Sequence, residues 1–364
     1  MKLVMTLLVR DEEDILDAQL AYHLNAGVDL VLATDHRSQD GTAEILDRYA
    51  REGYAHVFRE DDIGFRQAEW VSRMARLAAT EHGADWVINA DADEFWWPRG
   101  GRLKEILALV PPRYGIVRCF ERHFAPRVDQ SGHFAERMTV RFTSYGRHAG
   151  PEDPFQTAMQ VIHRADPSVT LVQGNHDVTS GGLRALRGWY PLEVLHFPLR
   201  TLDQARRKFD NKLQAVRTEP TEVGRHMLSA GRAIDDGRFE EWYAAYVKDG
   251  PAVDAGLADG SLVADTRLRD ALRGLAGVPS LSASSALAYA LAGGDTPPLE
   301  FPRGEVVAEA RYAEEMQPLD EWDGELRVLD RVTVLERRVA ALERGVGRRM
   351  TERVARARDT LRGR

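Results

Sequence analysis

The amino-terminal quarter of the chain alternates short apolar runs with stretches in which apolar residues recur every three or four positions. The run at residues 3–9 is almost entirely apolar, as is typical of a parallel strand covered on both faces. Similar runs at residues 30–34, 55–58 and 86–89 predict three further strands. The helical stretches between them end near residues that can stop a helix, namely Gly27, Gly53 and Gly83. This alternation predicts an α/β fold with a right-handed, doubly wound parallel sheet.

Helical patterns dominate the later part of the chain. Residues 201–204 have the form of a capping box and begin a helix whose apolar face we expect to close the first domain. Three basic residues on this helix could reach a bound diphosphate, but a solvated basic face is the favoured interpretation: Arg206, Arg207 and Lys208. Residues 219–319 show helical patterns that Gly and Pro interrupt, and they contain no motif that indicates chemistry.

The last part of the chain is basic and carries apolar residues at alternating spacings of four and three between Val328 and Val346. That spacing is typical of a short coiled-coil seam, which predicts a homo-oligomer, although packing back onto the protein is the alternative. Residues 331–364 hold 11 Arg against 4 acidic residues, so they could contact acidic lipid headgroups or remain a solvated helix. We therefore expect three parts: an α/β domain over residues 1–217, an additional helical domain over 218–324 and a basic helical tail over 325–364.

Composition narrows the class of protein. A chain of 364 residues with 43% hydrophobic content can bury a sizeable core. The amino-terminal apolar run is too short to span a bilayer and no cleavage site follows it, which predicts no export signal. A single cysteine, Cys119, rules out an internal disulfide and fits a cytoplasmic location. The net charge of −8 argues against nucleic acid as a partner.

Three carboxylates fall within four residues at the end of the fourth predicted strand, in the sequence DADE at residues 91–94. Ligands of open α/β sheets collect at the carboxyl ends of the strands, so we expect Asp91 and Asp93 to face a crevice. Carboxylate oxygens there suit Mg²⁺ or Mn²⁺, which keep open positions for substrate phosphates. The structural alternative is an acidic turn that caps the next helix.

A second polar segment, DHRSQDGT at residues 35–42, follows the second predicted strand. Asp40 or Thr42 can cap the next helix, and Gly41 can adopt a positive φ. Asp35 leaves its strand towards the same crevice, where its carboxylate could accept hydrogen bonds from a nucleobase or ribose. No glycine-rich phosphate-binding fingerprint follows the first strand, which disfavours NAD.

The order and spacing of these segments resemble those of family-2-type glycosyltransferases. The resemblance covers roughly residues 3–95 and rests on VRDE (9–12), YHLNAGV (22–28), DHRSQDGT (35–42) and DADEF (91–95). A weaker resemblance continues through VIHR (161–164), GNHD (174–177) and LHFPLR (195–200). It implies a GT-A fold, a Rossmann-like nucleotide-sugar-binding domain whose DxD motif holds a divalent metal against the donor diphosphate. One departure is Asp11, where the family more often has Asn.

Carried over residue by residue, the resemblance implies a donor site at this crevice. Arg10, Glu12 and Asp35 would line the nucleotide pocket, with Asp35 near the base, and Arg66 and Gln67 could join them. Asp91 would lie by the ribose and metal, and Asp93 would coordinate Mn²⁺ or Mg²⁺. A histidine from the later half often completes such a site, and His196 is preferred to His176, although either could be an ordinary core or loop histidine. A UDP-sugar is the commonest donor in this family.

Inverting transfer also needs a base that deprotonates the acceptor hydroxyl. The pair Glu152 and Asp153 resembles the Glu-Asp pair that supplies this base in many family-2 enzymes, although flanking prolines also fit a simple turn. Asp177 and Glu121 are the other candidates. Four aromatic residues could stack on sugar rings, but packing is the favoured interpretation: Trp96, Trp97, Trp189 and Tyr190.

The sequence thus predicts a metal-dependent, inverting glycosyltransferase that acts on a hydroxyl of a glycan or glycolipid precursor, as in polysaccharide biosynthesis. The basic tail suggests peripheral contact with the inner membrane face. Two alternatives come from other classes of protein. The GNHD motif at residues 174–177 also occurs in metallophosphoesterases, but their companion motifs are missing. A non-catalytic protein that binds sugar nucleotides and assembles through its tail is the other.

Overall fold

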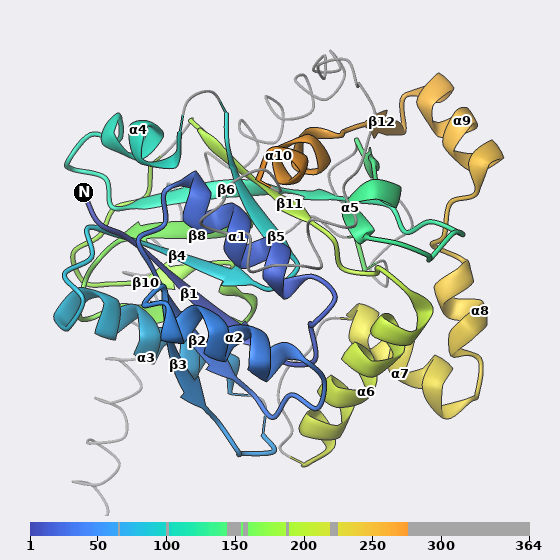
Figure 1. Ribbon diagram of the computed structural model, residues 1–364, viewed down its shortest axis with the longest axis horizontal. Coiled ribbons are helices and arrows are strands. Elements are labelled where there is room, and N and C mark those ends of the chain that lie inside the picture. Colours follow the sequence, from blue (N-terminus) through green and yellow to red (C-terminus); the bar gives the residue numbers. More distant parts are fainter. Residues whose placement is uncertain are drawn as a thin grey trace, which may run out of the picture. The chain divides into compact units, whose positions relative to one another are not determined.

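The computed structural model describes residues 1–64, 66–99, 102–143, 154–155, 159–186, 189–218 and 225–275 (Figure 1). Its main element is an eight-stranded sheet of order β3-β2-β1-β4-β8-β6-β11-β5. The bounds of the strands, in sheet order, are Ala55–Arg59, Leu30–Asp35, Leu3–Val9, Trp86–Asp91, Met159–Arg164, Ile116–His123, Leu192–His196 and Glu94–Pro98.

The four predicted strands form one parallel half of this sheet. Strand β1 pairs in parallel with β2 and β4, and β2 pairs in parallel with β3. Strands β6 and β11 are also parallel to each other, while β8 and β5 run antiparallel to their neighbours. The predicted α/β, Rossmann-like fold is therefore confirmed, and the antiparallel strands β8 and β5 are additions that the sequence pattern did not predict.

Helices cover both faces of the parallel half, which explains the near-continuous apolar character of its strands. On one face, Leu16 and Leu20 of α1 and Leu46 of α2 pack with Met5 and Val31. On the other face, α3 packs through residues such as Val71 and Met74. The helix bounds are Leu16–Ala26 for α1, Thr42–Arg51 for α2, Gln67–Thr80 for α3 and Leu103–Ala108 for α4. Gly27 ends α1 with a φ of 114°, as predicted.

The loops after β1 and β2 are bonded to each other. The backbone amide of Glu12 donates to the Thr42 hydroxyl at 2.9 Å, and the amide of Gly41 donates to a Glu13 carboxylate oxygen at 2.8 Å. The expectation of a positive φ at Gly41 is wrong, since its φ is −71°. An added Cβ at Gly41 would lie 2.9 Å from the same Glu13 oxygen, so that flexible side chain would have to shift.

Residues 202–275 continue from the sheet as helices and short strands. Helices α6, α7 and α8 pack through one apolar cluster that includes Phe209, Met227 and Phe239. Strand β12 pairs antiparallel with β7, and α10 packs against α1 and α5. Their bounds are Phe134–Arg137 for α5, Val140–Phe142 for β7, Leu202–Thr218 for α6, Arg225–Asp235 for α7, Phe239–Ala244 for α8, Gly250–Asp259 for α9, Leu262–Ala264 for β12 and Arg267–Leu275 for α10.

The described part of the predicted helical domain thus packs onto residues of the first domain. The three domain boundaries stay predictions, because the coiled-coil-like tail at residues 325–364 lies outside the described residues. Within the described ranges, no helix combines the length and apolar character that crossing a membrane requires.

A buried ionic network joins this later segment to the sheet. Arg141 on β7 bonds Asp265 at 2.8 Å, and Arg267 bonds Asp265 at 2.6 Å and also pairs with Glu193 on β11. Arg122 on β6 bonds the other oxygen of Glu193 at 2.7 Å. The Arg122 and Glu193 side chains are 1% and 0% exposed, so each charge depends on its partners. The network holds together β6 and β11, whose ends carry the site described below.

Replacing Glu193 with Gln should cost about 3–5 kcal/mol in the free energy of unfolding, because the charges of buried arginines lose their partner. Burial alone would raise the pKa of Glu193, but Arg122 and Arg267 lower it from 4.5 to about 2. The carboxylate therefore stabilises the fold fully above pH 4.5, and this contribution is lost as the pH falls towards 2. Urea unfolding at several pH values measures both effects.

The matched control is Asp235→Asn, which breaks an exposed ion pair with Arg217 and should cost less than about 1 kcal/mol. Equal costs for the two variants, or a cost for Glu193→Gln that does not shrink at low pH, would contradict the role assigned to the network.

Candidate functional site

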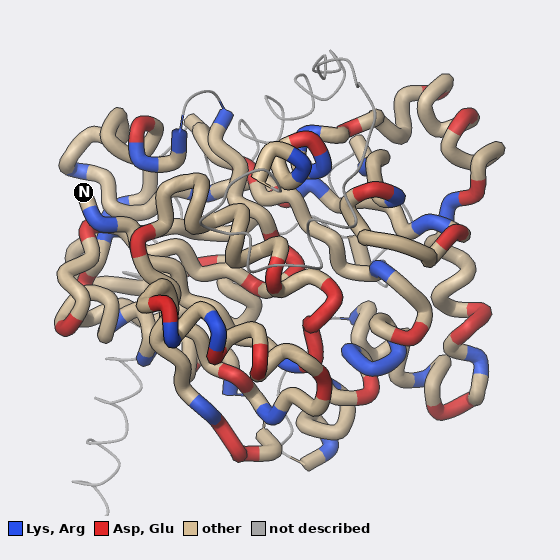
Figure 2. Tube along the Cα trace, in the orientation of Figure 1, with Lys and Arg blue, Asp and Glu red and all other residues tan. Residues whose placement is uncertain are grey.

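Six strands of the sheet run in the same direction and therefore end at one edge: β1, β2, β3, β4, β6 and β11. A pocket opens at this edge between the sheet and helix α6. It is lined by Leu8, Val9, Arg10, Glu12, His36, Gln67, Asp91, Ala92, Asp93, Lys208, Asn211, Lys212 and Ala215. Figure 2 shows acidic and basic residues gathered where the loop after β1 meets α6. The structure thus brings together Arg10, Glu12, Gln67, Asp91 and Asp93, which the sequence singled out, while their roles stay predictions.

Asp91 ends β4 and is held by two side-chain amides. Its Oδ1 accepts hydrogen bonds from Gln67 Nε2 and from Asn175 Nδ2, both at 3.1 Å. Gln67 is in turn fixed by the backbone amide of Gly174, which donates to its Oε1 at 3.2 Å. Burial raises the pKa of Asp91, and the neighbouring Asp93 raises it further. The Asp91 side chain is therefore fixed at the wall of the pocket, and a cation bound nearby would stabilise its ionised form.

Glu94, the third acid of the cluster, turns away from the pocket. Its carboxylate accepts from the backbone amide of Asp91 at 3.1 Å and from Gln160 Nε2 at 2.6 Å. Burial, with the acids around it, raises the pKa of Glu94 well above its ordinary value. The turn leads into strand β5, so the alternative of an acidic turn that caps a helix is wrong.

Asp93 lies in the turn after β4 and is 2% exposed. Three cationic groups face its Oδ2: Lys208 Nζ, His196 Nε2 at 3.5 Å and Arg200 Nη1 at 4.0 Å. Burial alone would raise the pKa of Asp93, but Lys208 and His196 hold it well below its ordinary value. Asp93 is therefore an ionised carboxylate at neutral pH.

The prediction that Arg206, Arg207 and Lys208 form a solvated face of α6 is wrong for one of these residues. Lys208 points into the pocket and pairs with Asp93. Arg206 and Arg207 are exposed, as expected, and Arg206 bonds Asp210 at 3.0 Å. An amphipathic pattern does not distinguish a lysine that reaches inwards from one that points to water, because the long stem allows either.

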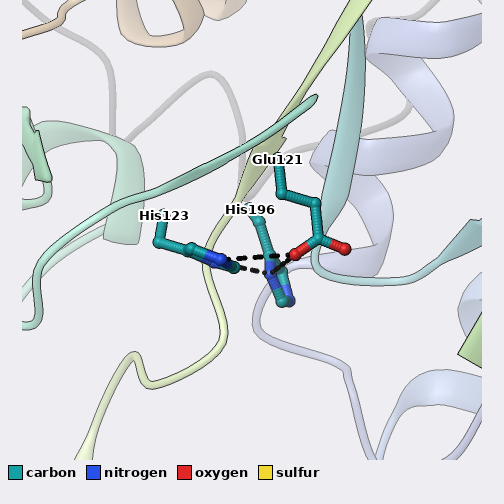
Figure 3. Close-up of side chains that lie close together, drawn as sticks. All are labelled: Glu121, His123 and His196. Atoms are coloured by element: carbon teal, nitrogen blue, oxygen red, sulfur yellow. Dashed lines mark hydrogen bonds and ion pairs between the residues drawn. The ribbon is translucent and has the colours of Figure 1, made fainter. Parts of the chain in front are cut away.

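His196, at the end of β11, lies against Glu121 and His123 at the end of β6 (Figure 3). His196 Nδ1 is 3.0 Å from His123 Nδ1 and 3.6 Å from Glu121 Oε2, while His123 Nε2 is 3.3 Å from the same Glu121 oxygen. The register explains this contact, since His196 pairs directly with His123 across the parallel strands. Burial alone would lower the pKa of His196, but Asp93 and Glu121 raise it to about 10.

Sequence reasoning named Glu121 only as a rival base and missed His123. The available signal was their i, i+2 spacing at the end of an apolar strand, which places both side chains on one face. That signal does not say which other strand lies alongside. The pairing of β6 with β11 is what brings His196 to them.

Other residues selected from the sequence do not line the pocket. Asp35 is buried at the end of β2 and pairs with Arg59, and His36 takes the place beside the pocket. Arg66 is largely exposed and lies 3.2 Å from Asp62. His176 is exposed, and Asp177 lies 3.6 Å from Arg118. The base candidates Glu152 and Asp153 lie outside the described residues.

Most of the aromatic residues considered for sugar stacking pack against other side chains, as expected. Trp96 is 0% exposed in the core, and Trp97 stacks on Tyr22 with ring centroids 5.9 Å apart. Tyr190 packs against Phe120 at 4.6 Å. Trp189 is 38% exposed and is the most exposed of these four residues.

Two donor sets for a divalent metal share His196. One is Asp93 Oδ2 with His196 Nε2, and the other is His196 Nδ1 with Glu121 and His123. Carboxylate and imidazole donors together suit Mn²⁺, Fe²⁺ or Zn²⁺. One imidazole presents a single nitrogen to a given ion, and its other nitrogen is normally held by a neighbouring group. The residues present therefore fit a metal, with one set binding it and the other orienting the ring.

Asp11 follows β1 with a φ of 53°, a left-handed conformation that is uncommon for residues other than glycine. Its carboxylate accepts from the backbone amide of Gln39 and from Asn211 Nδ2, both at 2.6 Å. Asp11 therefore links the loops after β1 and β2 to helix α6, beside the pocket.

No family model matches the chain, and no curated protein is similar to it in sequence. A solved structure that resembles it is glucosyl-3-phosphoglycerate synthase from Mycobacterium tuberculosis with Mn²⁺, UDP and glucosyl-3-phosphoglycerate, at 20% identity and a TM-score of 0.25, over 33% of this chain and 44% of that chain. Another is S. aureus TarS 1–349 with UDP, at 14% identity and a TM-score of 0.31, over 88% and 92%. The chain thus spans less than half of the synthase. Similarities at this level do not by themselves indicate function.

Replacing His196 with Ala should weaken Mn²⁺ binding at least about 10-fold, since both donor sets lose their shared ligand. Titration of Mn²⁺ followed by electron paramagnetic resonance measures this directly. His56→Ala is the matched control, because His56 is exposed on β3, outside the pocket. Unchanged Mn²⁺ affinity in His196→Ala would contradict both sets. A larger loss in Asp93→Asn than in His123→Phe would identify Asp93 as the ligand.

Proposed function

We propose that this protein is a metal-dependent glycosyltransferase that transfers a sugar from a nucleotide-sugar donor to a hydroxyl acceptor. The observation that carries the proposal is the approach of His196 Nε2 to within 3.5 Å of Asp93 Oδ2 at the carboxyl edge of the sheet. In the resemblance to family-2-type enzymes, these are the residues expected to hold the metal. They come from segments more than a hundred residues apart, and the fold brings them together beside one pocket.

Asp93 and His196 would hold the metal in this proposal. A bound divalent cation there would offset the negative charge that develops on the departing nucleoside diphosphate. Glu121 and His123 would fix the His196 ring from its Nδ1 side, leaving Nε2 directed at Asp93. Gln160 supports this arrangement, because its Nε2 donates to Glu121 Oε1 at 2.7 Å and so fixes the carboxylate.

The rest of the pocket supplies contacts for the nucleotide. Asp91 is held by Gln67 and Asn175 in a fixed orientation and would accept a hydrogen bond from the ribose. Arg10 and His36 also line the pocket and would contact the base, with Asp35 preceding His36 at the end of β2. Glu12 is paired with Arg200 and shapes the wall next to Asp93. We expect a UDP-sugar, the donor most common among the enzymes that the sequence resembles.

Inversion at the anomeric carbon, with Asp153 or Glu152 as the base, belongs to the same proposal and rests on sequence resemblance. Glu121 is less suited to that task, because its two oxygens are engaged by Gln160 and by the histidines. Asp177 lies beside Arg118 and does not line the pocket.

The pocket also bears on the hydrolase alternative. His176 and Asp177 of the GNHD motif do not line the pocket with Asp91 and Asp93. Asn175 does reach Asp91, but as an amide donor to a carboxylate. A metallophosphoesterase would need these groups around shared metal ions, so the arrangement favours the transferase. A binding protein without catalysis would be distinguished by the absence of sugar transfer.

Thermal unfolding with UDP-, GDP-, dTDP- and CMP-sugars, with and without Mn²⁺, tests the donor site. A ligand at 100 times its dissociation constant should add about 2.7 kcal/mol to the free energy of unfolding. We expect one nucleotide class to raise the melting temperature in a Mn²⁺-dependent manner, with the effect lost in Asp93→Asn. Asp166→Asn is the control, because Asp166 lies on a loop outside the pocket and bonds Ser168. Absence of a shift with every donor would reject the proposal.

We also propose a cytoplasmic protein that contacts the inner membrane face through residues 331–364, where a glycolipid or glycan precursor would be the acceptor. The support is the excess of 11 Arg over 4 acidic residues in that segment. Deleting residues 331–364 should abolish sedimentation with vesicles that contain anionic lipid, while neutral vesicles should bind neither protein. Equal binding of the full-length and shortened proteins would contradict this assignment.

A further inference from the structure

Lys208 lies where the proposed metal and the proposed donor would meet. It is on α6, its side chain is 22% exposed, and its ammonium pairs with Oδ2 of Asp93, which is 2% exposed. The same oxygen is 3.5 Å from His196 Nε2 and would be the metal-binding atom of the proposed function. One carboxylate oxygen thus serves both the lysine and the metal site.

The two cations compete for that oxygen. Two unit charges about 4 Å apart repel by about 4 kcal/mol at an effective dielectric constant of 20, and a divalent ion doubles this. Lys208 must therefore leave Asp93 when a metal binds. Arg200 has no such freedom, because it is fully buried and bonds Asp14 at 2.7 and 2.8 Å. Lysine instead carries a single charge on a flexible four-carbon stem.

The pocket offers the Lys208 ammonium a second partner, a phosphate group bound beside α6. Lys212 lies one helical turn further along α6, on the same face, and also lines the pocket. Asn211 lies between them in sequence and lines it as well. A diphosphate that bridges from Asp93 towards α6 would meet this basic face. Its negative charge would replace the carboxylate that Lys208 gives up.

We propose that Lys208 is the counter-ion of Asp93 in the donor-free protein and a phosphate ligand in the donor complex. This inference rests on the proposed function for its second half. The metal frees Lys208 from Asp93, and the nucleoside diphosphate then binds the freed ammonium. Metal and nucleoside diphosphate therefore strengthen each other's binding, and by linkage the coupling is the same in both directions. Without a nucleoside diphosphate, the metal therefore binds less tightly than it would if Lys208 did not compete for Asp93.

Lys208→Met separates the two roles, because it should change the two affinities in opposite directions. Mn²⁺ alone should bind about tenfold more tightly than to the wild type, since its competitor is gone. UDP in saturating Mn²⁺ should bind about tenfold more weakly, since a phosphate contact is lost. Electron paramagnetic resonance measures the first affinity, and isothermal titration calorimetry measures the second.

The matched control is Arg206→Met, which removes one positive charge from an exposed position on the same helix and should change neither affinity. Circular dichroism and urea unfolding test whether both variants fold. If Lys208→Met does not fold, Lys208→Gln is used in its place. Lys208→Arg keeps the charge and should retain tight UDP binding.

Weaker or unchanged Mn²⁺ binding by the neutral Lys208 variant would overturn the inference, and so would unchanged UDP affinity. In either case, binding of UDP by the wild type would leave the proposed function standing. A wild type that binds Mn²⁺ but no nucleoside diphosphate would overturn the proposed function and the phosphate role of Lys208 together.

Discussion

Charge buried at one edge of the sheet is the constraint on which the rest of this structure depends. An ionised carboxylate removed from water costs several kcal/mol unless a cation or hydrogen-bond donors replace the water. Asp93 is compensated by Lys208 and His196, and Glu12 by Arg200. Arg200 also bonds Asp14, which lies 186 positions away in the sequence. Neutralising the pocket therefore fixes the approach of α6 and β11 to the loop after β1.

The buried ionic network around Glu193 does the same for the sheet. Glu193 on β11 is bonded by Arg122 on β6 and by Arg267 at the start of α10. These bonds hold β6 and β11 in register and attach α10 to them. That register places His196 opposite His123. A slip of one residue would turn the side chains of a strand to its other face, and the histidine–glutamate contact would be lost. Stability and site geometry thus depend on the same ionic pairs.

Local pattern was enough to predict the parallel half of the sheet and the acidic turn at its edge. Strands covered on both faces are almost entirely apolar, and Asp91 ends one of them while Asp93 lies in the turn that follows. The other half could not be predicted in this way. Glu121, His123 and His196 come together only through the pairing of β6 with β11, which is a long-range contact. The inward turn of Lys208 likewise depends on the position of Asp93, which no helical periodicity contains.

Asp11 shows how backbone shape can limit sequence variation beside a binding site. Its left-handed φ of 53° disfavours β-branched and bulky residues, and its two short hydrogen bonds require an acceptor close to the backbone. Aspartate accepts both bonds, one on each oxygen, whereas asparagine has a single acceptor oxygen and would pair with Asn211 only if that amide turned to present its own oxygen. The backbone at this position and the amide of Asn211 are thus matched to each other, so a change in one of these two residues constrains what the other can be.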